Sequence, residues 1–347
     1  MGRVFSAHHE GMGCDVAIKV LGPAFGLHPQ ARERFMREAR IAARVSSPHA
    51  VRVLDHACAG IVPYIVFEKV EGEDLASRLH RRGTLSPREL VTIVRQLASA
   101  LDAVHAAGVV HCDVKLANVM VFENQGAIEA KLIDFGVARA LDETPLDGDE
   151  SPSGTIYAMS PEQILKPDEA APHWDLWGLA VLAFTGLNGR APFQGRSMIG
   201  VLGAVVQGQR ESLDAVRIAL GREVDQVFDR AFSIALQERF STAAEFAEAL
   251  AAALEPQIDK ADAILDAIAI SMNEEDPVTA VRRRADMTTR PHARRDDRAT
   301  RDPRRTSWIN EKDGAFSTST SKKFGGGRAP TWRTAPSRPL IAATVGR

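Results

Sequence analysis

Cysteine is scarce in this 347-residue sequence, and its three cysteines follow no C-x-x-C spacing. An odd, scattered set of this kind (Cys14, Cys58, Cys112) argues against a disulfide framework and against a zinc site. Long apolar runs are also missing, since no stretch approaches the roughly 18–20 residues that a membrane span needs. The N-terminus shows no signal-peptide pattern. We therefore expect a soluble cytoplasmic protein with no membrane partner.

Net charge is small, −2, but the two signs are unevenly distributed along the chain. Residues 277–347 hold 17 Lys and Arg against 6 Asp and Glu, whereas residues 1–276 hold 26 against 39. Apolar residues make up 45% of the sequence, which is ordinary for a globular protein with a substantial core. The sequence thus predicts an acidic folded body followed by a basic tail.

Hydrophobic periodicity predicts a sheet-rich region followed by a larger helical one. We expect strands at 16–21, 51–58 and 64–70, with a charged helix at 29–44. Helices should follow at 75–83 and 86–107, the second with Ser86 as its N-cap and Gly108 past its end. From 174 to 254 the pattern is mostly helical, and the acidic loop from about 139 to 155 should be mobile. This order predicts an α+β fold in two parts.

Two short stretches carry the chemistry. Residues 111–118, His-Cys-Asp-Val-Lys-Leu-Ala-Asn, place a carboxylate, an ammonium and an amide in one loop, and Asp134-Phe135-Gly136 follows. Such groups suit a metal-bound phosphate chain with a hydroxyl placed against it. Lys19 lies inside an apolar run, where its charge needs a partner, and Glu38 on the next helix is a candidate. The alternative is an edge strand whose lysine reaches solvent.

These stretches resemble the signature of protein kinases, specifically the bacterial serine/threonine kinases of eukaryotic (Hanks) type. The matching segments are the lysine strand, the catalytic loop, the metal motif and the Ala-Pro-Glu motif. Here they read Val16-Ala17-Ile18-Lys19, His111-Cys112-Asp113 with Asn118, Asp134-Phe135-Gly136, and Ser160-Pro161-Glu162. The resemblance implies a two-lobed kinase domain over residues 1–254, with a small β-rich N-lobe (about 1–70) and a larger helical C-lobe (about 71–254).

The resemblance further implies an enzyme that uses ATP and Mg²⁺ to phosphorylate protein hydroxyls, its own included. Lys19 would hold the α- and β-phosphates, and Glu38 would orient this lysine. Asp134 and Asn118 would bind magnesium. Asp113 would accept the proton of the substrate hydroxyl or orient that hydroxyl.

Other matching residues would support the catalytic loop and the substrate. Lys115 would neutralise the γ-phosphate, and a lysine at this position favours serine and threonine over tyrosine as acceptors. Thr155 would support the loop from the activation segment. Glu162 would pair with Arg239, and Asp175 would brace the loop from a central helix.

By the same resemblance, the strand at 64–70 leads into the hinge that binds adenine through backbone groups. Phe67 would be the gatekeeper, although a core aromatic is the alternative and both can hold. The nucleotide contacts implied for the N-lobe, besides Lys19 and Glu38, are Gly2, Val4, Ala17, Phe67, Glu68 and Val70.

The glycine-rich loop departs from the family pattern. Gly2 and Val4 match its last glycine and its valine, but its first two glycines and the strand before them have no counterpart. Either the start was assigned too late and Met1 is an internal residue of a longer protein, or half of the phosphate lid is lacking. As the sequence stands, we expect the sheet to lack one neighbour and nucleotide binding to be weakened.

Cys112 replaces the arginine that clamps a phosphorylated activation loop in relatives. Without this cation, we expect activity not to require phosphorylation of that loop. The Cys112 side chain itself is either a small packed group or a thiol sensor. Ser160 replaces the alanine of Ala-Pro-Glu, which is a small change that adds a hydroxyl.

Residues 255–275 suggest one more helix, and residues 276–347 are expected to form a disordered, basic tail. This tail is either a solvated extension or a regulatory segment whose phosphosites bind phosphopeptide-recognising partners or that folds back on the acidic body. Nucleic acid is disfavoured as a partner, because Trp308 and Trp332 are too few for a stacking platform. Two rival functions stay open: a pseudokinase scaffold and a kinase-like small-molecule phosphotransferase.

Overall fold

A computed structural model describes residues 2–22, 25, 27–60, 62–142, 156–213, 218, 220–258 and 332–333. The mobility expected of the acidic loop falls mostly on residues 143–155, which lie outside the described residues. The helix expected at 255–275 is described only to Ile258, as a short 3₁₀ turn η4 (Glu255–Gln257) and one helical residue. Of the tail expected to be disordered, only Trp332 and Arg333 are described.

The N-terminal part is an antiparallel sheet. Its strands are β1 (Gly2–His9), β2 (Cys14–Leu21), β3 (Val53–Ala59) and β4 (Val62–Glu68), and their order from the β1 side is β1-β2-β4-β3. Gly13 and Gly60 close the two hairpins with φ of 64°, a conformation that glycine adopts without strain. The three predicted strands are confirmed as β2, β3 and β4, and each of their ends lies within two residues of the predicted position.

The outer edge of β1, which we expected to lack a neighbour, is paired at two positions. The short strand β10 (Trp332–Arg333) runs antiparallel to β1, with Arg333 opposite His8 and Trp332 opposite His9. The expectation of an unpaired edge is therefore wrong at the β1–β2 hairpin end of the strand.

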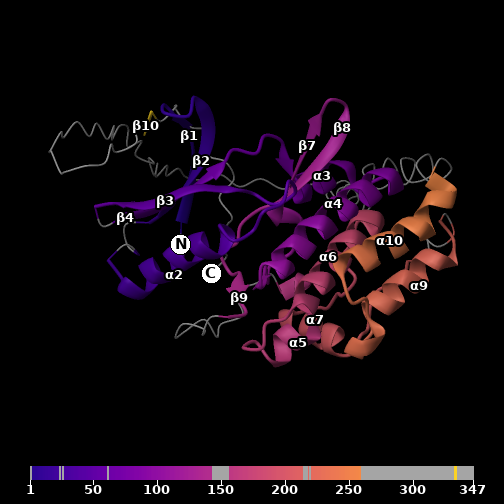
Figure 1. Ribbon diagram of the computed structural model, residues 1–347. Helices are drawn as coiled ribbons and strands as arrows, with labels where there is room; N and C mark the ends of the chain where they lie inside the picture. Colours follow the sequence, from indigo (N-terminus) through magenta and orange to yellow (C-terminus); the bar gives the residue numbers. More distant parts are fainter. Residues whose placement is uncertain are drawn as a thin grey trace, which may run out of the picture. The chain divides into compact units, whose positions relative to one another are not determined.

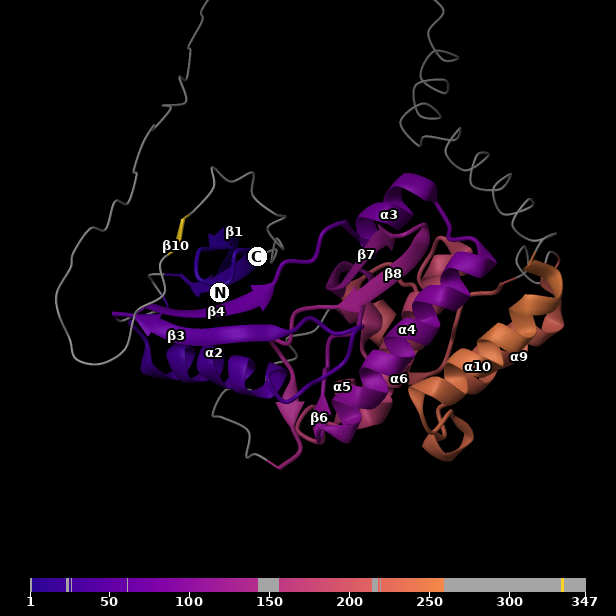
Figure 2. The same ribbon diagram turned by 45° about the horizontal axis from the view of Figure 1, so that its top comes forward.

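Helix α2 (Pro29–Ala42) covers one face of this sheet (Figures 1 and 2). Pro29 occupies its first turn, where a missing backbone N–H costs nothing. Its buried face contains Phe35, Glu38, Ala39 and Ile41, so a carboxylate is carried into a mostly apolar contact. This placement brings Glu38, in the middle of α2, within hydrogen-bond distance of Lys19 on β2.

The C-terminal part is built around two long helices, α4 (Pro87–Ala106) and α6 (Pro172–Asn188). Helix α4 begins as predicted, because the Ser86 hydroxyl accepts the Glu89 N–H at 3.3 Å. Nearly every residue of α6 is buried, as expected for a helix surrounded by other elements. Among the described residues, this region also contains the α-helices α3 (Leu75–Arg82), α5 (Pro161–Leu165), α7 (Met198–Val206), α9 (Arg222–Ala231) and α10 (Ala243–Leu254).

Short strands, which the periodicity did not predict, position the loops of interest. Strands β7 (Val119–Asn124) and β8 (Ala127–Leu132) form a hairpin that pairs with β5 (Glu73–Asp74). Strand β6 (Val109–Val110) pairs with β9 (Arg139–Ala140). The loop 111–118 therefore leaves β6 and enters β7, and Asp134 follows β8, so both stretches emerge from the same end of this small framework. No helix within the described ranges has the length and apolar character to cross a bilayer.

Candidate active site

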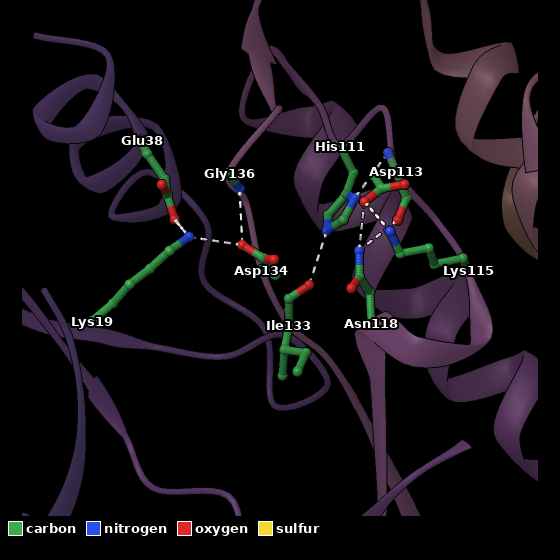
Figure 3. Close-up of polar contacts among 9 residues, drawn as sticks. All are labelled: Lys19, Glu38, His111, Asp113, Lys115, Asn118, Ile133, Asp134 and Gly136. Atoms are coloured by element: carbon green, nitrogen blue, oxygen red, sulfur yellow. Dashed lines mark hydrogen bonds and ion pairs between the residues drawn. The ribbon is translucent and has the colours of Figure 1, made fainter. Parts of the chain in front are cut away.

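Three charged side chains from separate elements meet beside β2 (Figure 3). Lys19 donates to Glu38 of α2, with Nζ and Oε1 2.5 Å apart, and to Asp134, with Nζ and Oδ1 2.9 Å apart. The Lys19 side chain is 17% exposed and that of Glu38 is 8% exposed. Because β2 lies between β1 and β4, it is not an edge strand. The predicted Lys19–Glu38 partnership is confirmed, and the alternative of a lysine reaching solvent from an edge is wrong.

The charge states of this group follow from its geometry. Burial alone lowers the pKa of the Lys19 ammonium, but the carboxylates of Glu38 and Asp134 outweigh it and hold that pKa above its usual value. Burial raises the pKa of Asp134, yet the ammonium of Lys19 overcomes this and leaves that pKa below its usual value. For Glu38, burial prevails and keeps the pKa raised. Near neutral pH, the group thus presents a cationic lysine and an ionised Asp134.

The close approach of this group leaves little room for a side chain at position 136. A Cβ on Gly136 would lie 3.0 Å from Oδ1 of Asp134 and 3.3 Å from Nζ of Lys19. The Gly136 N–H instead donates to the same Oδ1 at 3.2 Å. Asp134 has φ of 62°, which is uncommon for a residue with a side chain and is typical of functional turns.

A second group forms within the loop that precedes β7. Oδ2 of Asp113 accepts from Nζ of Lys115 at 2.7 Å and from Nδ2 of Asn118 at 2.9 Å. The 3₁₀ turn η1 (Leu116–Asn118) returns the chain so that the same Nδ2 also donates to the Asp113 carbonyl at 2.9 Å. The structure therefore brings the predicted carboxylate, ammonium and amide into one cluster.

His111 and Ile133 connect the two groups (Figure 3). Nε2 of His111 donates to the Ile133 carbonyl at 3.2 Å, and the Ile133 N–H donates to the Asn118 carbonyl at 2.8 Å. The His111 ring also packs on Phe135, with centroids 4.9 Å apart. Since Ile133 directly precedes Asp134, the loop of the second group is fixed relative to the carboxylate of the first.

Asp175 braces this loop from α6, as predicted. Its buried carboxylate accepts the His111 N–H at 2.8 Å and the Cys112 N–H at 2.7 Å. His105, on the last turn of α4, donates from Nε2 to the same carboxylate at 2.8 Å. Three donors therefore satisfy a carboxylate that would otherwise be costly to bury.

Cys112 is a packed cysteine. Its side chain is buried with Val110 and Trp174, and its Sγ donates to the Val110 carbonyl at 3.5 Å. Burial first, and the Asp175 carboxylate second, raise the pKa of the Cys112 thiol well above its usual value. Since the thiolate is the reactive form, this environment opposes a sensor role. Gln163 holds the backbone at this point by donating from Nε2 to the Cys112 carbonyl at 2.9 Å.

The expected adenine side lies at the end of β4. Phe67 is 7% exposed and belongs to the main hydrophobic core, in agreement with the core interpretation of this residue. The Glu68 side chain points elsewhere, since Oε1 accepts from Nζ of Lys131 at 2.7 Å and from the Arg52 N–H at 3.0 Å. The Glu68 carboxylate is therefore engaged away from the expected base, and its backbone is the part of this residue that is a candidate for contact with it.

The predicted N-lobe contacts line up across β1 and β2. Val4 is opposite Lys19 in the β1–β2 ladder, and Ala17 is opposite Phe67 in the β2–β4 ladder. A Cβ on Gly2 would lie 3.4 Å from Cγ of Lys19. Gly2 and Val4 therefore lie beside Lys19.

The structural ion pair of the helical part is confirmed. Arg239 binds Glu162 through two hydrogen bonds, Nη2 to Oε1 at 2.7 Å and Nη1 to Oε2 at 3.1 Å. Ser160 is fully buried as the N-cap of α5, where its hydroxyl accepts the Gln163 N–H at 3.2 Å. Thr155 lies outside the described residues.

A divalent cation fits the donors between the two groups. Asp134 offers carboxylate oxygens, and Asn118 offers its amide oxygen because its Nδ2 is used by Asp113. Magnesium commonly takes one or two side-chain oxygens and completes its shell with water and phosphate. No group of three or more His, Cys, Asp or Glu that could hold a metal occurs in the described part of the chain.

Three residues of this region were not predicted from the sequence. His105 could have been noticed as a polar residue in the last turn of an amphipathic helix, next to the buried Val104. Gln163 and Lys131 carry no local signal, because their partners are distant in sequence.

Comparisons with known proteins agree with this geometry. The protein kinase domain family matches residues 1–250. The chain is 35% identical over 266 residues to serine/threonine-protein kinase PknH of Mycobacterium bovis, which covers 76% of this chain and 44% of that protein. It is 34% identical over 254 residues to serine/threonine-protein kinase PknE of Mycobacterium tuberculosis, covering 73% and 44%. For serine/threonine-protein kinase PknA of M. tuberculosis the identity is 36% over 206 residues, covering 58% and 47%.

The chain thus spans less than half the length of the curated relatives it matches. The matched region nevertheless contains both charged groups and the helices that brace them. Proteins of this family use ATP and a divalent metal. Together, the match over residues 1–250 and the identity to these bacterial kinases show that this chain belongs to the protein kinase family, in its bacterial serine/threonine (Hanks-type) branch.

Proposed function

We propose that this chain is an ATP- and Mg²⁺-dependent serine/threonine protein kinase whose catalytic domain comprises residues 1–254. The observation that carries the proposal is the juxtaposition of two groups: Lys19 with Glu38 and Asp134, and Asp113 with its lysine and amide partners. A phosphate chain between them would meet a cation on one side and a proton acceptor on the other.

The first group would bind the phosphates. Lys19 is held by Glu38, so its ammonium is oriented before a nucleotide arrives, which avoids a reorganisation cost during the reaction. Asp134 and Asn118 would hold Mg²⁺. When bound, this ion neutralises charge on the phosphate oxygens. The raised pKa of Lys19 keeps it cationic throughout the physiological pH range.

The second group would act on the acceptor. The hydroxyl oxygen of a serine or threonine forms a bond to the γ-phosphorus, and the bond from that phosphorus to the β–γ bridging oxygen breaks, so that ADP leaves. The hydroxyl proton passes to the carboxylate of Asp113. Lys115, 2.7 Å from this carboxylate, would compensate the negative charge of the transferred group.

The remaining contacts follow the family pattern. Backbone groups of Glu68 and Val70 would bind adenine, with Phe67 behind it and with Gly2, Val4 and Ala17 over the nucleotide. Protein substrates are supported by the chain's match to named protein kinases and by the Glu162–Arg239 pair, which fixes the segment after the activation loop. The tail would carry phosphosites recognised by phosphopeptide-binding partners.

Transfer of labelled γ-phosphate tests the proposal. Wild type should label both itself and a generic protein such as casein, with label on serine or threonine by phosphoamino acid analysis. Asp134→Ala should abolish transfer. The same measurement on a version extended upstream of Met1 shows whether a complete glycine-rich loop increases the transfer rate.

The outcomes separate the rival functions. Absence of transfer by the extended version, with nucleotide still bound, would favour a pseudokinase scaffold. Label on a small hydroxyl compound but on no protein would favour a small-molecule phosphotransferase. Label that persists in Asp134→Ala would contradict the assignment of the site.

A further inference from the structure

A half-buried ion pair that involves neither Lys19 nor Asp113 connects the two parts of the fold. Nζ of Lys131 lies 2.7 Å from Oε1 of Glu68, and their side chains are 15% and 24% exposed. Glu68 ends β4 in the large sheet, whereas Lys131 belongs to β8 in the helical part. The contact therefore crosses the connection between the two lobes.

The segment between α2 and β3 completes the connection. Oε1 of Glu68 also accepts the Arg52 N–H at 3.0 Å, and the Glu68 N–H donates to the Arg52 carbonyl at 3.0 Å. Just before it, the Val51 N–H donates to the Leu132 carbonyl and the Leu132 N–H to the His49 carbonyl, both at 2.8 Å. Residues 49–52 thus bind both β4 and β8.

Chain connectivity places this network between two functional positions. Glu68 is two residues before Val70, at the expected adenine edge, and Lys131 is three residues before Asp134. A displacement of β8 relative to the end of β4 would change the separation between the adenine-binding backbone and the metal-binding carboxylate. Positioning errors of this kind reduce catalysis strongly even when the catalytic groups are intact.

We propose that Glu68 and Lys131 form an interlobe tie that fixes the adenine edge relative to Asp134. This inference rests on the proposed function and assigns both side chains as positioning residues, not as nucleotide ligands. The tie is present in the same structure as the Lys19–Glu38 and Lys19–Asp134 pairs, so it is compatible with an assembled phosphate-binding group. Because the pair is partly removed from water, loss of one partner leaves the other charge poorly solvated.

The test uses the full chain with three variants: Glu68→Gln, Lys131→Met and the double variant. Glutamine retains an oxygen for the Arg52 N–H and removes only the charge. Each single variant should raise the dissociation constant of a non-hydrolysable ATP analogue about fivefold and lower kcat/KM by a similar factor. The double variant should be no worse than the singles, because coupled partners are not additive.

Glu169→Gln is the matched control. It removes an ion pair with Lys166 whose side chains are 68% and 62% exposed, and exposed pairs of this kind contribute little. This control should leave binding and transfer unchanged. Additive effects in the double variant, or a rise in activity in either single variant, would overturn the proposal.

Hydrogen exchange supplies a readout that needs no activity. In nucleotide-free protein, the Glu68, Val51 and Leu132 amides should exchange about fivefold faster in Glu68→Gln and Lys131→Met than in wild type or the control. If wild type neither binds nucleotide nor transfers phosphate while these amides still respond, the kinase proposal fails and the tie stands. Unchanged exchange in both variants refutes the tie whatever the activity.

Discussion

Lys19 shows how a charged residue becomes compatible with a buried strand. Its Nζ has two carboxylate partners within 2.9 Å, one from a helix and one from a loop more than a hundred positions away. The same contacts explain why the pKa values of Lys19 and Asp134 are displaced in opposite directions. Removal of the lysine would leave two neighbouring carboxylates without a cation, so its effect should depend on pH.

Lys19→Met should abolish phosphate transfer and should lower the free energy of unfolding most at neutral pH. With the lysine present, the depressed pKa of Asp134 gives stability above its ordinary unfolded pKa of about 3.9, and this stability is lost as the pH falls. Without it, burial raises the pKa of both Asp134 and Glu38, and protonation relieves their repulsion. The difference in unfolding free energy between wild type and variant should therefore narrow from pH 7 towards pH 4.

Chemical denaturation at several pH values, with far-UV circular dichroism as the probe, measures this difference. Lys166→Met, which removes an exposed lysine, is the control and should show no such trend. If the difference in unfolding free energy between wild type and Lys19→Met widened as the pH falls, the assigned charge states of Lys19 and Asp134 would be wrong.

Cys112 leads to a prediction about regulation. The loop around it is held by Asp175 and Gln163, and neither contact requires a phosphate. Asp142, at the start of the acidic loop, already pairs with Arg44 at 2.8 Å. We therefore expect transfer activity that does not depend on phosphorylation of the activation loop.

Alanine substitution of the acceptor residues of that loop, Thr144, Ser151 and Ser153, checks this expectation. The three residues lie outside the described part of the structure. The triple variant should retain transfer to an added protein within about threefold of wild type, since no cation at position 112 awaits a phosphate. Loss of transfer would show that another group binds a phosphate on the activation loop and that activity depends on this contact.

At the scale of elements, α6 determines where the catalytic loop lies. Asp175 binds the loop backbone, and one turn later Gly178 allows close contact. A Cβ on Gly178 would lie 2.7 Å from the Val114 carbonyl oxygen and 2.9 Å from the Val114 Cβ. Both contacts are shorter than van der Waals distance, so any side chain here must displace the loop or the helix.

Gly178→Ala should therefore destabilise the protein by about 1–3 kcal/mol and lower kcat, although it adds only a methyl group to a helix. Gly203→Ala in α7 is the matched control, because a Cβ there meets nothing within 4 Å. The control should raise stability by about 0.5–1 kcal/mol through helix propensity alone. If Gly178→Ala and Gly203→Ala had equal effects on thermal unfolding and on phosphate transfer, the close contact of Gly178 with Val114 would not determine the position of the loop.

At the scale of the whole molecule, charge is divided between body and tail. The tail beyond residue 276 has 17 basic residues, and the preceding chain has a clear excess of acidic ones. Attraction between them would be strong at low ionic strength and weak at high, because the Debye length falls from about 30 Å at 0.01 M to about 3 Å at 1 M.

Deletion of residues 277–347 should therefore raise the transfer rate at low salt and leave it unchanged at high salt, if the tail restrains the kinase. The measurement is the rate of phosphate transfer to an added protein substrate, for the full chain and for the chain without residues 277–347, at a series of salt concentrations. An unchanged rate at every salt concentration rules out autoinhibition and leaves a solvated extension.

Local patterns identified the strands β2, β3 and β4 and the helices α2, α3 and α4. Ser86 with Glu89, and Gly108 after the last turn, delimit α4 because capping chemistry acts within a few residues. The β7–β8 hairpin was not predicted, since short strands with little alternation are specified by their neighbours more than by their own sequence. Motif spacing predicted the lysine, the two aspartates and the asparagine as one site.

The sequence alone determined the family, the residue types at the site and the division of charge, because these depend on identity and order along the chain. The tertiary structure decided which groups meet. It paired Lys19 with both Glu38 and Asp134, turned the Cys112 thiol into a packed, protonated group, and directed the Glu68 side chain to Lys131. Such outcomes depend on distances and burial between segments far apart in sequence, which no local pattern encodes.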